Sequence, residues 1–175
     1  MGVISSYLKT YATFDCCDEA ARNGNLSELK RLHQSGHEWN EKTSYWAASS
    51  SLECLQYCHE NGCPWNHETT SYAASNGRLD CLKYAVENGC QILPFAPSLA
   101  SQSCDIECFK YCFTVLNDST FWDYPHYHID NIIDKIDLDD PIWKPLFNAN
   151  LSKYPTLESK VKAKIVQLES NNDTK

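Results

Sequence analysis

The chain has 175 residues, of which 42% are hydrophobic and 22% charged, a composition typical of a folded domain and not of a disordered chain. Its formal net charge of -8 opposes contact with phosphate backbones, so no nucleic-acid partner is expected. No apolar run approaches the roughly 20 residues that cross a bilayer, and the first residues do not predict a signal peptide. We therefore expect a cytoplasmic protein in a reducing compartment, where disulfides rarely persist.

Residues 1–15 are expected to form an N-terminal segment ahead of the first helix. Gly2 and Ser6 match the Met-Gly-x-x-x-Ser/Thr pattern of N-myristoylation, in which Gly2 carries the acyl chain. The pattern is short and often arises by chance, so a plain chain start is the alternative. Lys9 is the lone early cation, and one acyl chain alone holds a membrane only marginally. A membrane is expected as a partner only if Gly2 is myristoylated.

Residues 16–116 contain an internal repeat with a short period. Each of three aligned copies has an alanine pair near its start and a glycine near its end. The pairs begin at Ala20, Ala47 and Ala73, and the glycines are Gly36, Gly62 and Gly89. Successive glycines are 26 and 27 residues apart, and a fourth, weaker copy begins near Ala100. A period of this length indicates a stack of small repeated units.

The pattern within each copy predicts helix, turn, helix and loop. Gly24 and Gly77 stand at the bend, where a left-handed residue can end the first helix. The second helix carries apolar residues at i, i+3 and i+6, as Leu52, Leu55 and Cys58 do. Since a unit of this size is too small to bury its own core, the copies are expected to stack.

The pattern Ala-Ala-x-x-Gly-x-Leu-x-x-Leu…Gly-x-x-x-Asn resembles the helical body of ankyrin repeats. The variant Glu-Asn-Gly-Cys-Pro-Trp-Asn at residues 60–66 is similar to short ankyrin-type repeats that are abundant in giant DNA viruses of amoebae and in some protists. The resemblance covers roughly residues 16–113. It implies an all-α, ankyrin-like helical repeat solenoid, and a viral protein of the host cytoplasm or the virus particle.

The copies are shorter than the usual ankyrin repeat of about 33 residues and lack its Thr-Pro-Leu-His start. The missing residues are those of the β-hairpin finger, so truncated fingers are expected. Ankyrin proteins commonly bind partners with these fingers and the adjoining first helices. Because the fingers are expected to be truncated here, we expect the short loops and the first-helix residues of this chain to bind the partner. The partner-binding candidates are Glu41, Lys42, Ser44, Tyr45, His67, Glu68, Ser71 and Tyr72.

The ten cysteines need an explanation in so short a chain. Cys54, Cys81 and Cys108 occupy one repeat position on the apolar side of the second helix, which favours buried thiols that pack as small hydrophobic groups. A zinc site is the more specific alternative, because Cys104, Cys108 and Cys112 are spaced four residues apart and lie along one side of a helix. No Cys-x-x-Cys pair occurs, however, and a closed site needs four converging ligands. We expect core thiols, with neither a metal nor a cofactor.

Two further repeat positions admit two explanations each. Trp39 and Trp65 are equivalent, and their recurrence favours packing of loops on helices over a role as binding hot spots. Glu28 stands where the later copies have cysteine. It fits either the polar outer face of an end repeat or a pairing with Arg22 or Arg31.

Residues 117–175 are expected to form a helical C-terminal cap or extension. Isoleucines at helical spacing predict a helix over 127–136, and an apolar stripe predicts another over 156–170. The segment covers the last repeat if it is a cap, and docks a partner if it is an extension.

The sequence contains no Gly-rich phosphate loop, no Gly-x-Ser-x-Gly and no His-Glu-x-x-His, so no catalytic site is expected. We therefore expect a non-catalytic protein–protein interaction module, a scaffold or adaptor, with a protein partner. The alternatives are a structural component of a virus particle and a substrate receptor of a ubiquitin ligase. The latter would need residues 127–175 as its docking segment.

Overall fold

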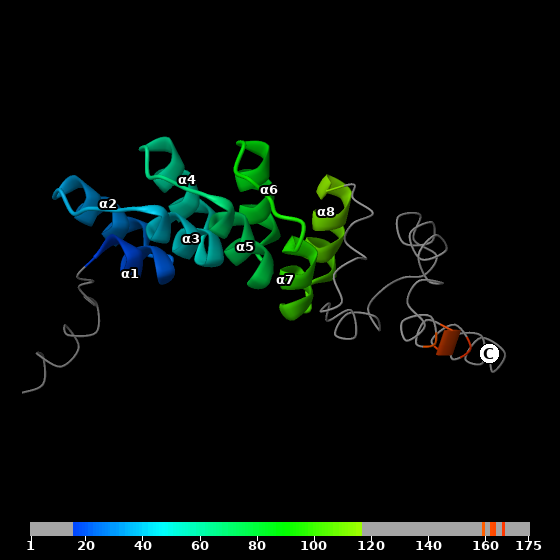
Figure 1. Cartoon of the computed structure of the whole chain (residues 1–175). Helices are drawn as coiled ribbons and strands as arrows, with labels where there is room; N and C mark the ends of the chain where they lie inside the picture. Colours follow the sequence, from blue (N-terminus) through cyan, green and yellow to red (C-terminus); the bar gives the residue numbers. More distant parts are fainter. Residues whose placement is uncertain (1–15, 117–158, 160–161, 164–165, 167–175) are drawn as a thin grey trace, which may run out of the picture.

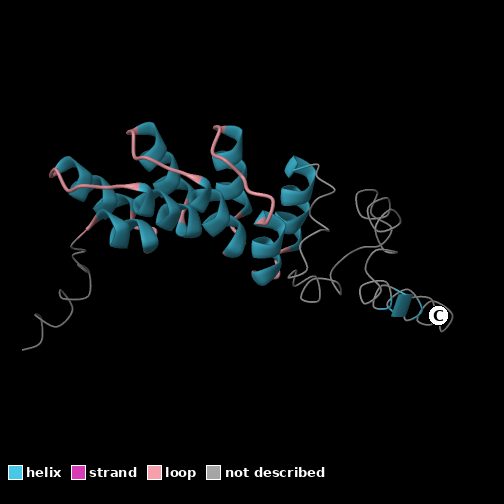
Figure 2. Cartoon of the chain, in the orientation of Figure 1, coloured by secondary structure: helices cyan, strands magenta, loops and turns pink. Residues whose placement is uncertain are grey.

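The computed structural model describes residues 16–116, together with Ser159, Lys162, Ala163 and Val166. Over residues 16–116 the chain is all-helical, with eight helices and no strand (Figures 1 and 2). The helices are α1 (Cys17–Arg22), α2 (Leu26–Gln34), α3 (Glu41–Ser50), α4 (Leu52–Glu60), α5 (His67–Ser75), α6 (Leu79–Glu87), α7 (Ala96–Gln102) and α8 (Ile106–Leu116).

The eight helices form two layers, which Figure 1 shows as a lower and an upper row. In one layer, called the inner layer, α1 contacts α3, α3 contacts α5 and α5 contacts α7. In the other, the outer layer, α2 contacts α4, α4 contacts α6 and α6 contacts α8. Each inner helix also packs on the outer helix that follows it in the chain. The inner helices approach one another more closely than the outer ones do.

Alanine explains the close approach within the inner layer. The alanine pairs of the repeat lie on α1, α3 and α5 and are completely buried. A methyl side chain at a helix contact allows a short distance between the helix axes. The outer helices contribute larger groups to the same core. The largest of these completely or almost completely buried side chains are Leu29, Leu32, Leu55, Leu82 and Phe109.

Specific residues start and end the helices. The asparagine of the Gly-x-x-x-Asn pattern is an N-cap, because the side chains of Asn40 and Asn66 each accept a backbone N–H bond of 2.8 Å at the start of α3 and α5. Gly24 and Gly77 have φ values of +65° and +67°, which agrees with the predicted left-handed bend. The other repeat glycines end the outer helices at positive φ; they are Gly36, Gly62 and Gly89.

Cys104 has the same left-handed backbone, φ +56°, at the repeat position that Gly24 and Gly77 hold. A side chain in this conformation costs roughly 1–2 kcal/mol. We expect Cys104→Gly to raise the free energy of unfolding by about 1 kcal/mol, since the relieved strain exceeds the entropy that glycine adds to the unfolded chain. Urea titration measures the difference. Cys104→Ala keeps the strained backbone, so equal stability of the two variants would contradict this explanation.

Glu28 pairs with Arg31 through two bonds of 2.7 and 2.9 Å, which is one of the two explanations considered for it. Its side chain is partly shielded, at 16% exposure. The repeat position that holds a buried thiol in the later copies thus holds a paired carboxylate in the first.

Several predictions from the sequence fall on other parts of the chain. Gly2, the segment 1–15 and the helix expected over 127–136 lie outside the described residues. Of the helix expected over 156–170, the four described residues are helical. No described helix combines the length and the apolar character that crossing a membrane requires.

Candidate partner-binding face

The candidate residues lie on α3 and α5, adjacent helices of the inner layer. Glu41 and Lys42 occupy the first turn of α3, directly after the Asn40 cap, and both are exposed. Glu68 is exposed in the first turn of α5, after the equivalent cap Asn66. The repeated cap therefore presents charged side chains at the same end of both helices.

Ser44 is buried, at 0% exposure, and serves the packing of the loop after α4. Its hydroxyl donates to the Pro64 carbonyl at 2.8 Å and lies 3.3 Å from the Cys63 sulfur. Thr70 holds the equivalent position on α5 and donates to the Gln91 carbonyl at 2.7 Å. Ser44 is therefore inaccessible to a partner in this structure, which removes it from the expected binding set.

An aromatic group lies at the centre of this face, formed by Tyr45 and Trp46 of α3 and Tyr72 of α5. Tyr45 stacks on Tyr72 with ring centroids 4.3 Å apart and an interplanar angle of 19°. Trp46 meets Tyr72 edge to face at 5.3 Å and lies 5.1 Å from Tyr45. We call these three residues the aromatic patch. The structure thus brings the two predicted tyrosines together and adds a tryptophan beside them.

Arg22 of α1 extends the aromatic patch into the preceding repeat. Its guanidinium carbon lies 4.6 Å from the centroid of the Trp46 ring, a cation–π contact. Neither Arg22 nor Trp46 was among the candidates from the sequence. The repeat contained a signal for Trp46, because it precedes Ala47 as Tyr72 precedes Ala73. The exposed Arg22 had no comparable signal, since the equivalent residues in later copies are uncharged.

Two carboxylates, those of Asp18 and Glu68, lie near the Tyr45 side of the aromatic patch. The pKa of Tyr45 lies above its ordinary value, first because the phenol is desolvated, and then because Tyr72, Glu68 and Asp18 disfavour its ionisation. Asp18 accepts a hydrogen bond from the hydroxyl of Thr43, which places its carboxylate between α1 and α3. The faces of aromatic rings and nearby carboxylates both attract positive charge. This face is therefore suited to a partner that presents cationic and apolar side chains.

His67 and Ser71 complete the expected set, and both are half-buried. The Ser71 hydroxyl donates to the His67 carbonyl at 2.8 Å, so it is engaged within its own helix. These residues flank Tyr72 on α5 without joining the aromatic contacts described above. Tyr45 is buried, at 9% exposure, so it offers a partner little surface in this structure. The accessible part of the predicted set is thus Glu41, Lys42 and Glu68, together with the half-buried His67, Ser71 and Tyr72.

The two repeat tryptophans lie elsewhere, on the outer layer, where they pack against histidines. Trp39 stacks on His33 at 3.6 Å, and Trp65 stacks on His59 at 4.0 Å. Each histidine Nδ1 also forms a hydrogen bond with a tyrosine hydroxyl of the next outer helix, at 2.9 and 2.8 Å. In each case the tryptophan packs its loop against the preceding outer helix, and the histidine–tyrosine hydrogen bond links that helix to the next outer helix.

The repeated thiols Cys54, Cys81 and Cys108 are completely buried in the core. Desolvation raises the pKa of each, for Cys81 to about 12, so these thiols stay protonated at neutral pH. All ten cysteines lie within residues 16–116, and eight of them are buried. Over the described residues, no three His, Cys, Asp or Glu side chains are grouped so that they could hold a metal ion.

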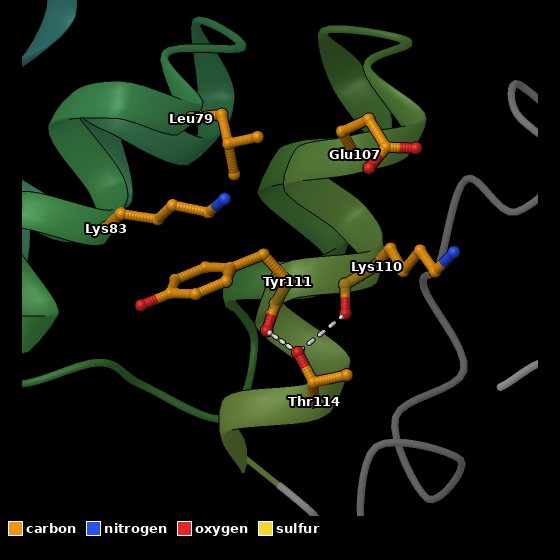
Figure 3. Close-up of a pocket in the computed structure, with 6 residues that line it drawn as sticks. All are labelled: Leu79, Lys83, Glu107, Lys110, Tyr111 and Thr114. Atoms are coloured by element: carbon orange, nitrogen blue, oxygen red, sulfur yellow. Dashed lines mark hydrogen bonds between the residues drawn. The ribbon is translucent and has the colours of Figure 1, made fainter.

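A shallow pocket lies between α6 and α8 of the outer layer (Figure 3). Its volume is about 180 Å³, below the roughly 300–1,000 Å³ of sites that bury a small-molecule ligand. The Lys83 ammonium on one wall lies 5.7 Å from the ring centroid of Tyr111 on the other. The Thr114 hydroxyl faces backbone carbonyls of its own helix and donates to them. The pocket is a gap between two outer helices.

Comparisons of the chain with models of protein families, with curated proteins and with solved structures found no match.

Proposed function

We propose that this chain is a non-catalytic protein–protein interaction module built as an ankyrin-like solenoid, and that it binds a protein partner through the inner layer. The sequence repeat supports the solenoid, because each copy corresponds to one helix pair and successive pairs contact each other in both layers. The lack of strands over residues 16–116 fits truncated fingers.

The aromatic patch is the observation that carries the proposal. Tyrosine, tryptophan and arginine are the residue types most enriched among binding hot spots. Here Arg22, Tyr45, Trp46 and Tyr72 gather across three inner helices, and charged residues at the start of α3 and α5 border them. A central aromatic group with a charged rim is the usual anatomy of a protein interface.

The test is affinity capture from the native source, followed by calorimetry with each purified partner. Trp46→Ala is expected to weaken binding at least about tenfold, because it removes the central ring of the aromatic patch. Tyr111→Ala is the matched control, since Tyr111 is a half-buried aromatic residue of the outer layer. It should change the affinity less than about twofold, within the range of a contact outside the interface.

Thermal unfolding of both variants shows whether the fold is retained before binding is compared. A partner that binds wild type and Trp46→Ala equally well would exclude the aromatic patch as the binding site. A loss of binding in Tyr111→Ala and not in Trp46→Ala would place the interface on the outer layer instead.

A further inference from the structure

A short helical stretch near the C-terminus presents an exposed apolar side chain among lysines. Its described residues, Ser159, Lys162, Ala163 and Val166, are helical and exposed. Among the described residues, Val166 is the most exposed large hydrophobic side chain, at 63%. Residues three and four apart share one face of a helix, so these four lie on the same side. Residues 159–166, which contain three lysines and no acidic residue, are called the basic segment.

The inner layer carries groups that complement the basic segment. Trp46 and Tyr72 of the aromatic patch are half-buried, so part of each ring is accessible to an apolar side chain. Glu41 and Glu68 are exposed in the first turns of the same two helices. The ring of Trp46 already accepts one cation, the guanidinium of Arg22 at 4.6 Å. An exposed helix face with valine and lysine therefore matches both features of this surface.

The charges of the two surfaces are opposite. The four inner helices carry four carboxylates and two cations, which gives them a net charge of -2. The basic segment carries +3 from Lys160, Lys162 and Lys164. Electrostatic attraction therefore favours their contact, and the apolar groups give that contact a defined position.

The basic segment is long enough in its connection to reach the inner layer of its own chain. Lys162 follows Leu116, the last residue of α8, by 46 residues. Even a fully helical chain of that length would span about 70 Å. The α7 and α3 helices are two helix contacts apart, about 20 Å at the usual spacing of packed helices.

The alternative occupant, the basic segment of a second copy, is less favoured. Two chains with a net charge of -8 each repel one another, whereas docking within one chain brings no second charged body near. A contact within one chain also needs little intrinsic affinity, because the connection gives the segment a high effective concentration.

We propose that the basic segment docks on the aromatic patch of its own chain, with Val166 against the Trp46 and Tyr72 rings and the lysines near Glu41 and Glu68. Docking covers the valine that is exposed in this structure. A partner that uses the same face must displace the segment, which makes the segment autoinhibitory. Only this last step rests on the proposed function, because the docking involves this chain alone.

The test is carbodiimide cross-linking of the dilute full chain, which joins a lysine amine to a carboxylate in direct contact with it. A protease that cleaves after aromatic residues places Glu41, Glu68, Glu53 and Glu60 on four separate peptides, which are 40–45, 66–72, 47–57 and 58–65. The basic segment falls on peptide 155–175.

Mass spectrometry of chains that migrate as monomers should find peptide 155–175 joined to the Glu41 or Glu68 peptide. Fragmentation should place the link on a lysine of the basic segment. Links to Glu53 and Glu60, which are exposed on the outer helix α4, should be at least about fivefold rarer, because docking raises the effective concentration only at the inner layer.

Val166→Ser keeps every group that the carbodiimide joins and removes the apolar contact. It should lower the yield of the inner-layer links at least about fivefold, because burial of a valine side chain shifts an equilibrium by about tenfold or more. Val115→Ser is the matched control, since Val115 is an exposed valine of α8. It should leave the yield unchanged. Circular dichroism verifies that both variants are folded.

Three results would overturn the docking. The inner-layer links could be no more frequent than those to Glu53 and Glu60, or Val166→Ser could leave their yield unchanged. Links found only in cross-linked dimers would place the basic segment on a second copy instead. Since the reaction contains no partner, each of these results leaves the proposed binding of a partner to be decided by calorimetry.

Discussion

Leu55→Ala should lower the free energy of unfolding by about 3 kcal/mol, the largest effect that we expect from a single substitution in this chain. Leu55 is completely buried in α4, and the α4 helix packs between α2 and α6. Truncation removes apolar surface from the core and leaves a cavity that the neighbouring helices cannot close without moving. The loss of buried apolar surface and the cavity therefore both lower the free energy of unfolding.

Leu52→Ala is the matched control, since Leu52 starts the same helix but is only half-buried. We expect a cost of about 1 kcal/mol there, because the loss scales with the apolar area removed from water. Denaturant titration of both variants gives the comparison. Equal losses would mean that Leu55 is not in a tightly packed core, which would contradict the two-layer arrangement.

Gly77→Ala should cost about 2 kcal/mol of stability, from backbone strain and crowding together. Gly77 has φ +67°, a conformation that disfavours any side chain. A β-carbon there would also lie 3.3 Å from the β-carbon of Asp105 and 3.4 Å from the hydroxyl oxygen of Ser103. These residues belong to the next bend, so the substitution would push two successive helix pairs apart.

Gly89→Ala separates the two causes. Gly89 also has positive φ, +85°, but an added β-carbon would meet nothing within 4 Å. The strain of a side chain at positive φ is then the remaining cost, so we expect Gly89→Ala to lower the free energy of unfolding by about 1 kcal/mol. Thermal and urea unfolding of the two variants measure the difference. If Gly89→Ala proved as damaging as Gly77→Ala, the contact between successive bends would carry no stability.

Local pattern was enough to predict the helices and bends of residues 16–116. Alanine pairs, bend glycines and apolar spacing act through residues close in the chain, so they indicated helix pairs without knowledge of the neighbours. The role of Asn40 and Asn66 as N-caps was missed, although both stand at one position of the repeat. Their side chains bond to backbone two residues ahead, a local interaction that sequence alone could have indicated.

The candidate face was predicted only in part. Tyr45 and Tyr72 were expected there, and the structure stacks them, but Ser44 is buried beneath the loop that contains Pro64. Adjacent residues on a helix point in different directions, so the side of α3 that faces the core depends on where α5 and that loop lie. Arg22 reaches Trp46 only because α1 packs on α3.

Periodicity along the chain was sufficient to predict the all-helical class, the repeat and the apolar positions. The contacts between polar and sulfur groups of different helix pairs depend instead on the tertiary packing. The bonds between Ser44 and Cys63 and between His33 and Tyr57 join residues 19 and 24 positions apart. Such contacts depend on how helix pairs are placed on one another, and no local pattern specifies that placement.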